Sequence, residues 1–213
     1  MDCDKNVLII GGTRGLGKSL LEFIPIAVGV GSAQLDITNP QIVKKFFEKQ
    51  TYDIIINCAC VNYNGFVDKQ TDEQIDQQIA VNAKGLVNIF RYCLPYMRKN
   101  NYGRIVTMSS VLTRKKQKGT SIYSATKGFV ENLTQAVALE NAKWNITINA
   151  IRSGYTTEGI IKDVPEELLG KIIEATPQKK LGSPQLLYKI INSLIDNDFM
   201  TGSIVDWNGG YLL

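Results

Sequence analysis

Short apolar runs alternate with longer amphipathic stretches along most of this chain. Apolar runs bounded by glycine, proline or polar residues are typical of buried strands, whereas hydrophobic residues three and four positions apart are typical of helices. The pattern predicts strands at Val7–Ile10, Gln34–Ile37, Asp53–Cys58, Arg104–Met108, Asn145–Ile151 and Ser203–Trp207, the second of them weak. It predicts helices at Leu16–Ile24, Gln41–Lys49, Asp72–Met97, Thr120–Asn141, Pro165–Ala175 and Pro184–Ile195.

This alternation predicts an α/β fold, a doubly wound parallel sheet with helices on both faces. The predicted strands are largely apolar, as expected where both faces of a sheet are covered. The chain has 213 residues and contains no internal repeat and no low-complexity linker. Residues 1–213 are therefore expected to form a single domain.

Composition excludes several classes of function. The formal net charge of +4 is too small to indicate a nucleic-acid partner. No apolar run approaches the ~18 residues that a membrane span requires, so no membrane association is expected. The chain contains no histidine, which excludes Ser-His-Asp catalysis and any histidine-ligated metal, and no metal site is predicted. General acid–base chemistry would therefore fall to Tyr, Lys, Asp, Glu or Cys.

The cysteines indicate a reducing environment. Cys3, Cys58, Cys60 and Cys93 lack the paired spacing of a zinc site, and a chain of this length needs no disulfide to stabilise its core. The apolar stretch nearest the N-terminus, Val7–Ile10, is too short for a secretory signal. The expected location is the cytoplasm.

A glycine-rich turn joins the first predicted strand to the first predicted helix. Residues Gly11–Gly17 read GGTRGLG. Glycines at such a turn let backbone N–H groups approach a pyrophosphate, and the helix N-terminus adds a partial positive charge there. A glycine cluster alone is a weak signal, but its place between the first strand and the first helix indicates a dinucleotide site.

A tyrosine and a lysine are spaced to share one helix face. Tyr123 and Lys127 are four residues apart, and Ser110, at the end of a predicted strand, precedes Tyr123 by thirteen residues. A tyrosine near its ordinary pKa of ~10 is a poor acid or base at neutral pH. A nearby ammonium favours the phenolate and is expected to lower that pKa.

Taken together, the G-x-x-x-G-x-G spacing and the Ser110, Tyr123 and Lys127 set resemble the short-chain dehydrogenase/reductase family over nearly the whole chain. The resemblance implies that Tyr123 is the acid/base and that Ser110 orients a substrate carbonyl. It also implies that Lys127 lowers the pKa of Tyr123 and holds the nicotinamide ribose. Asn82 matches the family's fourth catalytic residue, which implies a role in a water relay.

The same resemblance implies a cofactor site along the carboxyl edge of the sheet. The expected cofactor-binding residues are Gly11, Thr13, Arg14, Gly15, Leu16, Gly17, Ser32, Asp36, Ile37, Asn57, Cys58, Ala59, Tyr123, Lys127, Gly154 and Thr156.

The chain departs from the family pattern in a few places. In Asn57–Cys60, cysteines replace the second Asn and the Gly of the family's N-N-A-G, and Cys60 is expected near the adenine ribose. Ser153 stands where proline is usual. Between Gly17 and Leu35 only 17 residues intervene. The second strand is therefore expected to be brief and the helix after it to be missing, with Asp36 in the family's third strand.

The cofactor is expected to be NADP(H) rather than NAD(H). An acidic residue after the second strand would bind the ribose 2′-hydroxyl of NAD, whereas an arginine accommodates a 2′-phosphate. Arg14 lies in the glycine turn with Lys18 close behind, and Val30–Ser32 contains no acid. Asp36 is the competing candidate by position, but its Asp-Ile-Thr context fits the third strand better.

The resulting hypothesis is an oxidoreductase that moves hydride between a nicotinamide cofactor and a small carbonyl or alcohol substrate. A catalytically silent dinucleotide-binding regulator or scaffold is the alternative. A nucleotide-sugar epimerase or dehydratase would need a longer substrate region than the one that follows Gly154. The segment Tyr155–Pro177, expected to close over the substrate, has no pattern that selects a substrate class.

Two surface features remain open. Arg114–Lys118 holds four cations in five residues; it is either a solvated loop or attracts an anionic group of the substrate. A homodimer or homotetramer is implied mainly by the family resemblance. Its local indication is the apolar content of two predicted helices, at Ile79, Leu86, Ile89, Phe129 and Val137.

Overall fold

The computed structural model of the chain describes residues 4–159, 161, 164 and 166–213. These residues form a six-stranded sheet in which every pairing is parallel and the order is β2-β1-β3-β4-β5-β6. The predicted fold class is confirmed. The strands are β1 (Val7–Ile10), β2 (Ala27–Val30), β3 (Ile54–Asn57), β4 (Gly103–Ser110), β5 (Ile146–Ser153) and β6 (Ile204–Trp207).

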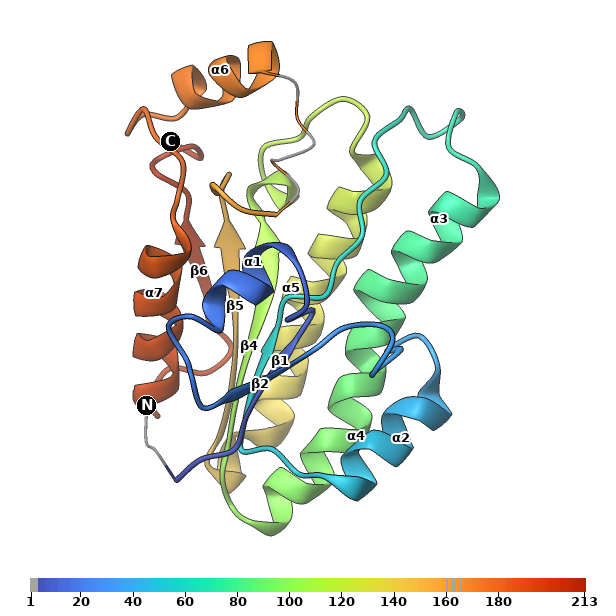
Figure 1. Ribbon diagram of the computed structural model, residues 1–213, viewed down its shortest axis with the longest axis vertical. Coiled ribbons are helices and arrows are strands. Elements are labelled where there is room, and N and C mark those ends of the chain that lie inside the picture. Colours follow the sequence, from blue (N-terminus) through green and yellow to red (C-terminus); the bar gives the residue numbers. More distant parts are fainter. Residues whose placement is uncertain (1–3, 160, 162–163, 165) are drawn as a thin grey trace.

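Helices cover both faces of the sheet (Figure 1). One face carries α2 (Pro40–Lys49), α3 (Asp72–Ile79), α4 (Gly85–Lys99) and α5 (Ser121–Asn141), and the other carries α1 (Gly15–Leu20) and α7 (Pro184–Asp196). Helix α6 (Glu166–Ala175) lies beyond the carboxyl ends of the strands; its predicted start at Pro165 is outside the described residues. Among the described residues, no helix is long and apolar enough to cross a membrane.

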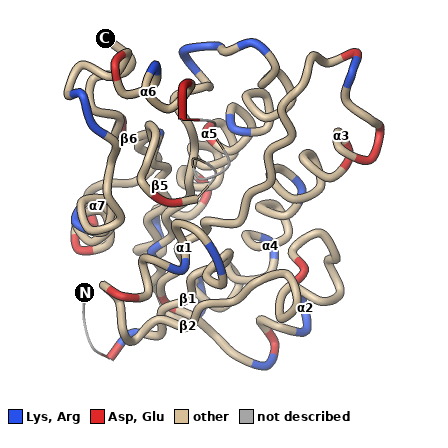
Figure 2. The backbone as a smooth tube through the Cα atoms, turned by 45° about the horizontal axis from the view of Figure 1, so that its top comes forward, with Lys and Arg blue, Asp and Glu red and all other residues tan. Residues whose placement is uncertain are grey.

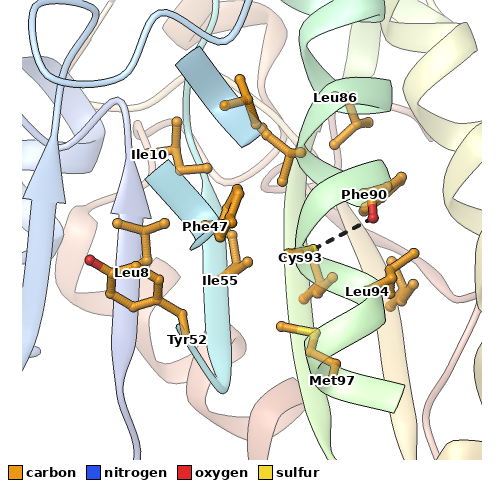
Figure 3. Close-up of a cluster of buried hydrophobic side chains, with 14 of the residues drawn as sticks. Leu8, Ile10, Phe47, Tyr52, Ile55, Leu86, Phe90, Cys93, Leu94 and Met97 are labelled. Carbon is orange, nitrogen blue, oxygen red and sulfur yellow. Dashed lines mark hydrogen bonds between the residues drawn. The ribbon is translucent and has the colours of Figure 1, made fainter. Parts of the chain in front are cut away.

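The larger core cluster fills the space between the sheet and the helices α2, α4 and α5. Figure 3 shows Leu8, Ile10 and Ile55 of the strands facing Leu86 and Phe90 of α4. Both Leu86 and Ile55 are fully buried. Burying such side chains stabilises the fold by about 1.5–3 kcal/mol each, and it fixes the sheet on which the site is built.

The predicted strand at Gln34–Ile37 does not form, whereas the expected brief second strand is confirmed as the edge strand β2. Leu35 and Ile37 alternate with polar residues, as in a strand. Both are buried in the core, but they anchor a loop there. Between them, Asp36 Oδ1 accepts hydrogen bonds from the Thr38 amide (2.9 Å) and hydroxyl (2.7 Å). A side chain bonded to the backbone two residues on favours a turn over a strand.

The strand order is therefore the doubly wound order with its third strand missing. The chain passes from β1 outward to β2 and then returns to the other side of β1 as β3. The gap between the carboxyl ends of β1 and β3 is the topological switch point, where ligands bind in such sheets.

Two predicted helices differ from the observed ones. The first ends at Leu20, and turns carry the chain from there to Pro25. The long helix predicted at Asp72–Met97 is divided by a π-helical segment, Ala80–Lys84. Such segments are rare and often lie at functional sites, and this one contains Asn82.

Candidate active site

The glycine turn lies at the switch point. Gly11 has a φ of +81°, and a Cβ there would lie 2.7 Å from the Ala59 nitrogen, across the gap to the loop after β3. A Cβ on Gly17 would lie 2.3 Å from the Gly11 oxygen. Glycine is therefore required at two places: where the turn approaches the loop after β3, and where α1 packs against the turn. The first N–H groups of a helix have no acceptor within it, and in α1 no side chain caps them.

Two side chains lie near the Tyr123 hydroxyl, one from a strand and one from a loop. Ser110, at the end of β4, and Cys60, in the loop after β3, both lie close enough to it to shift its pKa. Tyr123 is buried, with 8% of its surface exposed. Three segments distant in the sequence thus converge on one phenol at the carboxyl edge of the sheet.

Lys127 lies one turn of α5 beyond Tyr123 and is buried. Its Nζ donates a hydrogen bond of 2.8 Å to the Met108 carbonyl oxygen and lies 5.7 Å from the centre of the Tyr123 ring. An ammonium has three N–H donors. Among the described residues, Met108 supplies its hydrogen-bond acceptor, which leaves donors available to a bound hydroxyl group.

The expectation that Lys127 lowers the pKa of Tyr123 stays a prediction, because other influences determine the net direction of the shift. Burial raises the pKa of Tyr123 well above its ordinary value, and the charge and hydrogen bond of Cys60 raise it further. The hydrogen bond to Ser110 acts in the opposite direction but does not reverse the shift. Spacing along a helix predicted that the two side chains share a face, but it could not show that Lys127 is bonded to the strand.

Cys60 is a site residue whose place the sequence did not predict. It was expected near the adenine ribose, whereas the structure brings it to the Tyr123 hydroxyl. Its thiol is half-buried and contacts the Val61 carbonyl at 3.6 Å. The absence of the family's glycine was a visible signal, but its consequence depends on how the loop after β3 is folded.

Asn82 fixes that loop. Its Oδ1 accepts from the Val61 amide (2.9 Å), and its Nδ2 donates to the Val61 carbonyl (2.8 Å) and to the Thr126 hydroxyl (3.1 Å). One turn earlier, Gln78 accepts a hydrogen bond from the Tyr63 amide. The side-chain amide of Asn82 is thus committed to protein partners, and a water relay at this position would have to use its backbone.

On the adenosine side, Arg14 and Ser32 are exposed near the ends of α1 and β2. Thr13 packs against Gly31, where a Cβ would lie 2.3 Å from the Thr13 hydroxyl oxygen. Asp36 is bonded to Thr38, as described above. The structure therefore places a cation, and no free acid, next to the turn in this region of the described residues.

The remaining predicted cofactor residues are divided between the turn and the packing around it. Asn57 Oδ1 accepts from the Ala59 amide at 3.2 Å, which shapes the loop after β3. Cys58 is half-buried next to α1, and desolvation of its thiol raises its pKa to about 12. Ile37 is buried, and its carbonyl accepts from Asn88. Leu16, in the first turn of α1, packs against the core on that face.

The segment after β5 does not present all its predicted residues to the turn. Gly154 packs on Asn208, and the Thr156 hydroxyl donates to the Glu158 carbonyl at 2.8 Å. Instead Gly159 approaches the turn, with its Cα 3.0 Å from a Cβ built on Gly15. Residues 160, 162, 163 and 165 of the expected substrate segment lie outside the described residues.

The basic loop Arg114–Lys118, which precedes α5, also lies at the carboxyl edge of the sheet (Figure 2). Lys115 Nζ donates to the Tyr211 carbonyl at 3.0 Å and lies 4.0 Å from the centre of its ring. Lys116 donates to the Thr113 carbonyl. Tyr155 stacks edge-on against Tyr211 and donates to the Gln117 side chain at 2.9 Å. The loop, the residue after Gly154 and the C-terminal segment thus form one connected wall.

A parallel sheet with a glycine turn at its switch point, and a Ser-Tyr-Lys set beside it, defines a dinucleotide-dependent oxidoreductase. A family model of short chain dehydrogenases matches residues 23–168. The chain belongs to this family, as its sequence predicted, and it is an NAD(P)-dependent oxidoreductase that acts on carbonyl or alcohol groups.

Individual relatives agree with this assignment. The chain is 37% identical to an acetoacetyl-CoA reductase of Rhizobium meliloti (strain 1021), with 95% of this chain and 96% of the relative covered. It is 28% identical to the 3-oxoacyl-acyl-carrier-protein reductase FabG of Buchnera aphidicola subsp. Baizongia pistaciae, with 97% and 96% covered. The structure of ElxO with NADP bound superposes with a TM-score of 0.87 at 28% identity, covering 98% of both chains.

Proposed function

We propose that this protein reduces the ketone of a 3-oxoacyl thioester with NADPH. The observation that carries the proposal is the convergence of Ser110, Tyr123 and Lys127 at the carboxyl end of β4. There Lys127 Nζ donates to the Met108 carbonyl at 2.8 Å and lies 5.7 Å from the centre of the Tyr123 ring. The substrate class is supported by the relatives, which include acetoacetyl-CoA reductases and 3-oxoacyl-acyl-carrier-protein reductases.

Each residue of the set has a separate chemical role in this proposal. NADPH, when bound, supplies the hydride that reaches the carbonyl carbon. Tyr123 gives its proton to the carbonyl oxygen, and Ser110 donates a hydrogen bond that holds this oxygen in place. Lys127 binds the nicotinamide ribose through the donors that Met108 leaves available. Its positive charge stabilises the Tyr123 phenolate that the transfer leaves behind.

The described residues fit the cofactor. The glycines of the turn admit no side chain, and the uncapped start of α1 offers N–H groups and a partial positive charge to the pyrophosphate. We assign the preference for NADP(H) to Arg14, because its exposed guanidinium can pair with the 2′-phosphate. Asp36 Oδ1 already accepts two hydrogen bonds from Thr38, so we assign Asp36 to the turn and not to the ribose.

The wider organisation follows the same proposal. Residues 1–213 would act as one catalytic and dinucleotide-binding domain in a homodimer or homotetramer. The free thiols of Cys58, Cys60 and Cys93 suit the reducing cytoplasm. The alternative, a silent dinucleotide-binding regulator, is not favoured by any feature of the described residues, because the proposed proton donor and its partners lie together at the end of β4.

Acetoacetyl-CoA and ethyl acetoacetate form a matched pair for testing the substrate, since they share an acyl group and only the first carries phosphates. NADPH consumption followed at 340 nm should be faster with the thioester, and its advantage should fall as ionic strength rises. Lys115→Ala/Lys116→Ala should reduce kcat/KM for the thioester alone. Turnover of neither compound, and of no other carbonyl compound, would favour the silent binder.

A further inference from the structure

The helix face that carries Tyr123 and Lys127 continues to a third residue. Positions 123, 127 and 131 are each one turn apart on α5, so their side chains lie in a row. Glu131 faces the end of β4, as Tyr123 and Lys127 do. Its contacts indicate a role in the proposed reaction. Neither the Ser110, Tyr123 and Lys127 set nor the similarity to known reductases points to this role.

Glu131 binds one residue before Ser110 in the sequence and one residue after it. The Ser109 hydroxyl donates to Glu131 Oε1 at 2.6 Å, and the Thr113 hydroxyl donates to the same oxygen at 2.9 Å. Thr113 ends the short 3-10 turn, Val111–Thr113, that Ser110 caps through its own hydroxyl. The carboxylate therefore holds the residue before Ser110 and the turn after it.

The carboxylate is itself fixed by Arg152 on β5. Two parallel hydrogen bonds join Arg152 to Glu131, from Nε to Oε1 at 2.9 Å and from a terminal nitrogen to Oε2 at 2.8 Å. Arg152 also pairs with Asp206 of β6 at 2.7 Å. The side chains of Arg152 and Glu131 are only 11% and 13% exposed. A bidentate pair of this kind has a narrow range of geometries, so it fixes α5 relative to the sheet.

The contacts between α5 and β4 then form a series. The hydroxyls of Thr134 and Thr107 are hydrogen-bonded to each other. Glu131 accepts a hydrogen bond from Ser109, and Lys127 donates one to the Met108 carbonyl. The last member is the pair Tyr123 and Ser110. Because Tyr123 is on the helix and Ser110 on the strand, their separation depends on the members before them. Glu131 is the charged member nearest to Ser110 along the strand.

We propose that Glu131 is a positioning residue of this enzyme: by binding Ser109 and Thr113 while paired with Arg152, it holds the Ser110 hydroxyl against Tyr123. This inference rests on the proposed function for its effect on rate, but the Ser110–Tyr123 contact itself can be measured without turnover. A displacement of a reacting group by about 1 Å can reduce a rate by as much as ~100-fold.

The test uses Glu131→Gln, which keeps the size of the side chain, and Glu140→Gln as a matched control on the exposed face of the same helix. Glu131→Gln should lower kcat by about 10- to 100-fold with an unchanged dissociation constant for NADPH. In a Ser110→Ala background the same substitution should have no further effect on kcat. Glu140→Gln should match the unaltered protein.

The 13Cζ chemical shift of Tyr123 gives a readout that needs no substrate, because it responds to hydrogen bonds at the hydroxyl. Glu131→Gln should move it toward the value of Ser110→Ala and should not move it further in that background. Ser109→Ala, which keeps the Glu131–Arg152 pair, should cause a smaller change in the same direction and serves if Glu131→Gln does not fold. An unchanged Tyr123 signal in a folded Glu131→Gln or Ser109→Ala variant would overturn this inference. Absence of turnover with a displaced signal would overturn the proposed function alone.

Discussion

Lys127 donates its 2.8 Å hydrogen bond to the carbonyl of Met108, two residues before Ser110 on the same strand. The ammonium is therefore held by β4 and not by the phenol beside it. One strand end thus orients both the cation and the hydroxyl that the proposed function assigns to act with Tyr123. In the protein without ligands, the electrostatic state of Tyr123 is set by burial, Cys60 and Ser110.

This arrangement predicts the titration of Tyr123. Because its pKa is raised, ligand-free Tyr123 should stay protonated at pH 10, where an ordinary tyrosine is half ionised. Any stability that this group contributes is complete below pH 10 and is lost as the pH rises through the folded-state pKa. Cys60→Ala removes two influences that raise the pKa, so it should move the titration to lower pH. Cys93→Ala, at a buried cysteine of the core, should not. Tyr123 signals followed by 13C NMR from pH 8 to pH 12 would show both effects, and an unshifted titration in Cys60→Ala would contradict this account.

Cofactor preference should depend on Arg14. A charge-assisted hydrogen bond is worth about 1.5–3 kcal/mol, so Arg14→Gln should raise KM for NADPH by about 10- to 100-fold. KM for NADH, which lacks the 2′-phosphate, should stay within a factor of about two. Steady-state kinetics with both cofactors at a fixed substrate concentration provide the comparison. An equal rise in KM for NADPH and for NADH would show that Arg14 supports the glycine turn and does not bind the 2′-phosphate.

Acid should remove the stabilising contribution of Glu131. Burial alone would raise its pKa, but the hydrogen bonds from Arg152, Ser109 and Thr113 lower it overall. A carboxyl with a lowered folded-state pKa stabilises the protein above its ordinary pKa of about 4.3, and this stability is lost as the pH falls through the lowered value. The difference in unfolding free energy between the unaltered protein and Glu131→Gln should be largest at pH 7 and shrink at pH 3. Urea unfolding at both values measures it; a difference that does not change with pH would be inconsistent with the ionised pair.

Association of the chain should depend on the outer surface of α3, α4 and α5. Of the residues that suggested an oligomer, Leu86, Ile89 and Val137 are buried against the sheet, whereas Ile79 and Phe129 are 47% and 41% exposed. Val87 and Leu139 add to the exposed apolar surface of these helices. Light scattering at micromolar concentration should give the mass of a dimer or tetramer, and Phe129→Glu should reduce it. A monomeric mass for the unaltered protein would refute the prediction.

The sequence was sufficient for the class of fold and for the helix spacing of Tyr123 and Lys127, because both depend on local periodicity. It failed at Gln34–Ile37, where two core anchors imitate the alternation of a strand and Asp36 forms a turn. It also could not show the approach of Cys60 to Tyr123, which depends on how Asn82 holds the loop after β3. The pairing of Glu131 with Ser109 and Arg152 joins three elements, and no spacing within one element could indicate it.

The most direct test of the account is the turnover of Tyr123→Phe, which removes one hydroxyl and keeps the ring that fills the site. With NADPH and acetoacetyl-CoA, kcat should fall by about 100- to 10,000-fold, the range expected for loss of a general acid. NADPH binding, measured by fluorescence, and the thermal unfolding midpoint should stay close to those of the unaltered protein. A folded Tyr123→Phe variant that keeps a near-normal kcat would contradict the assignment of Tyr123 as the proton donor.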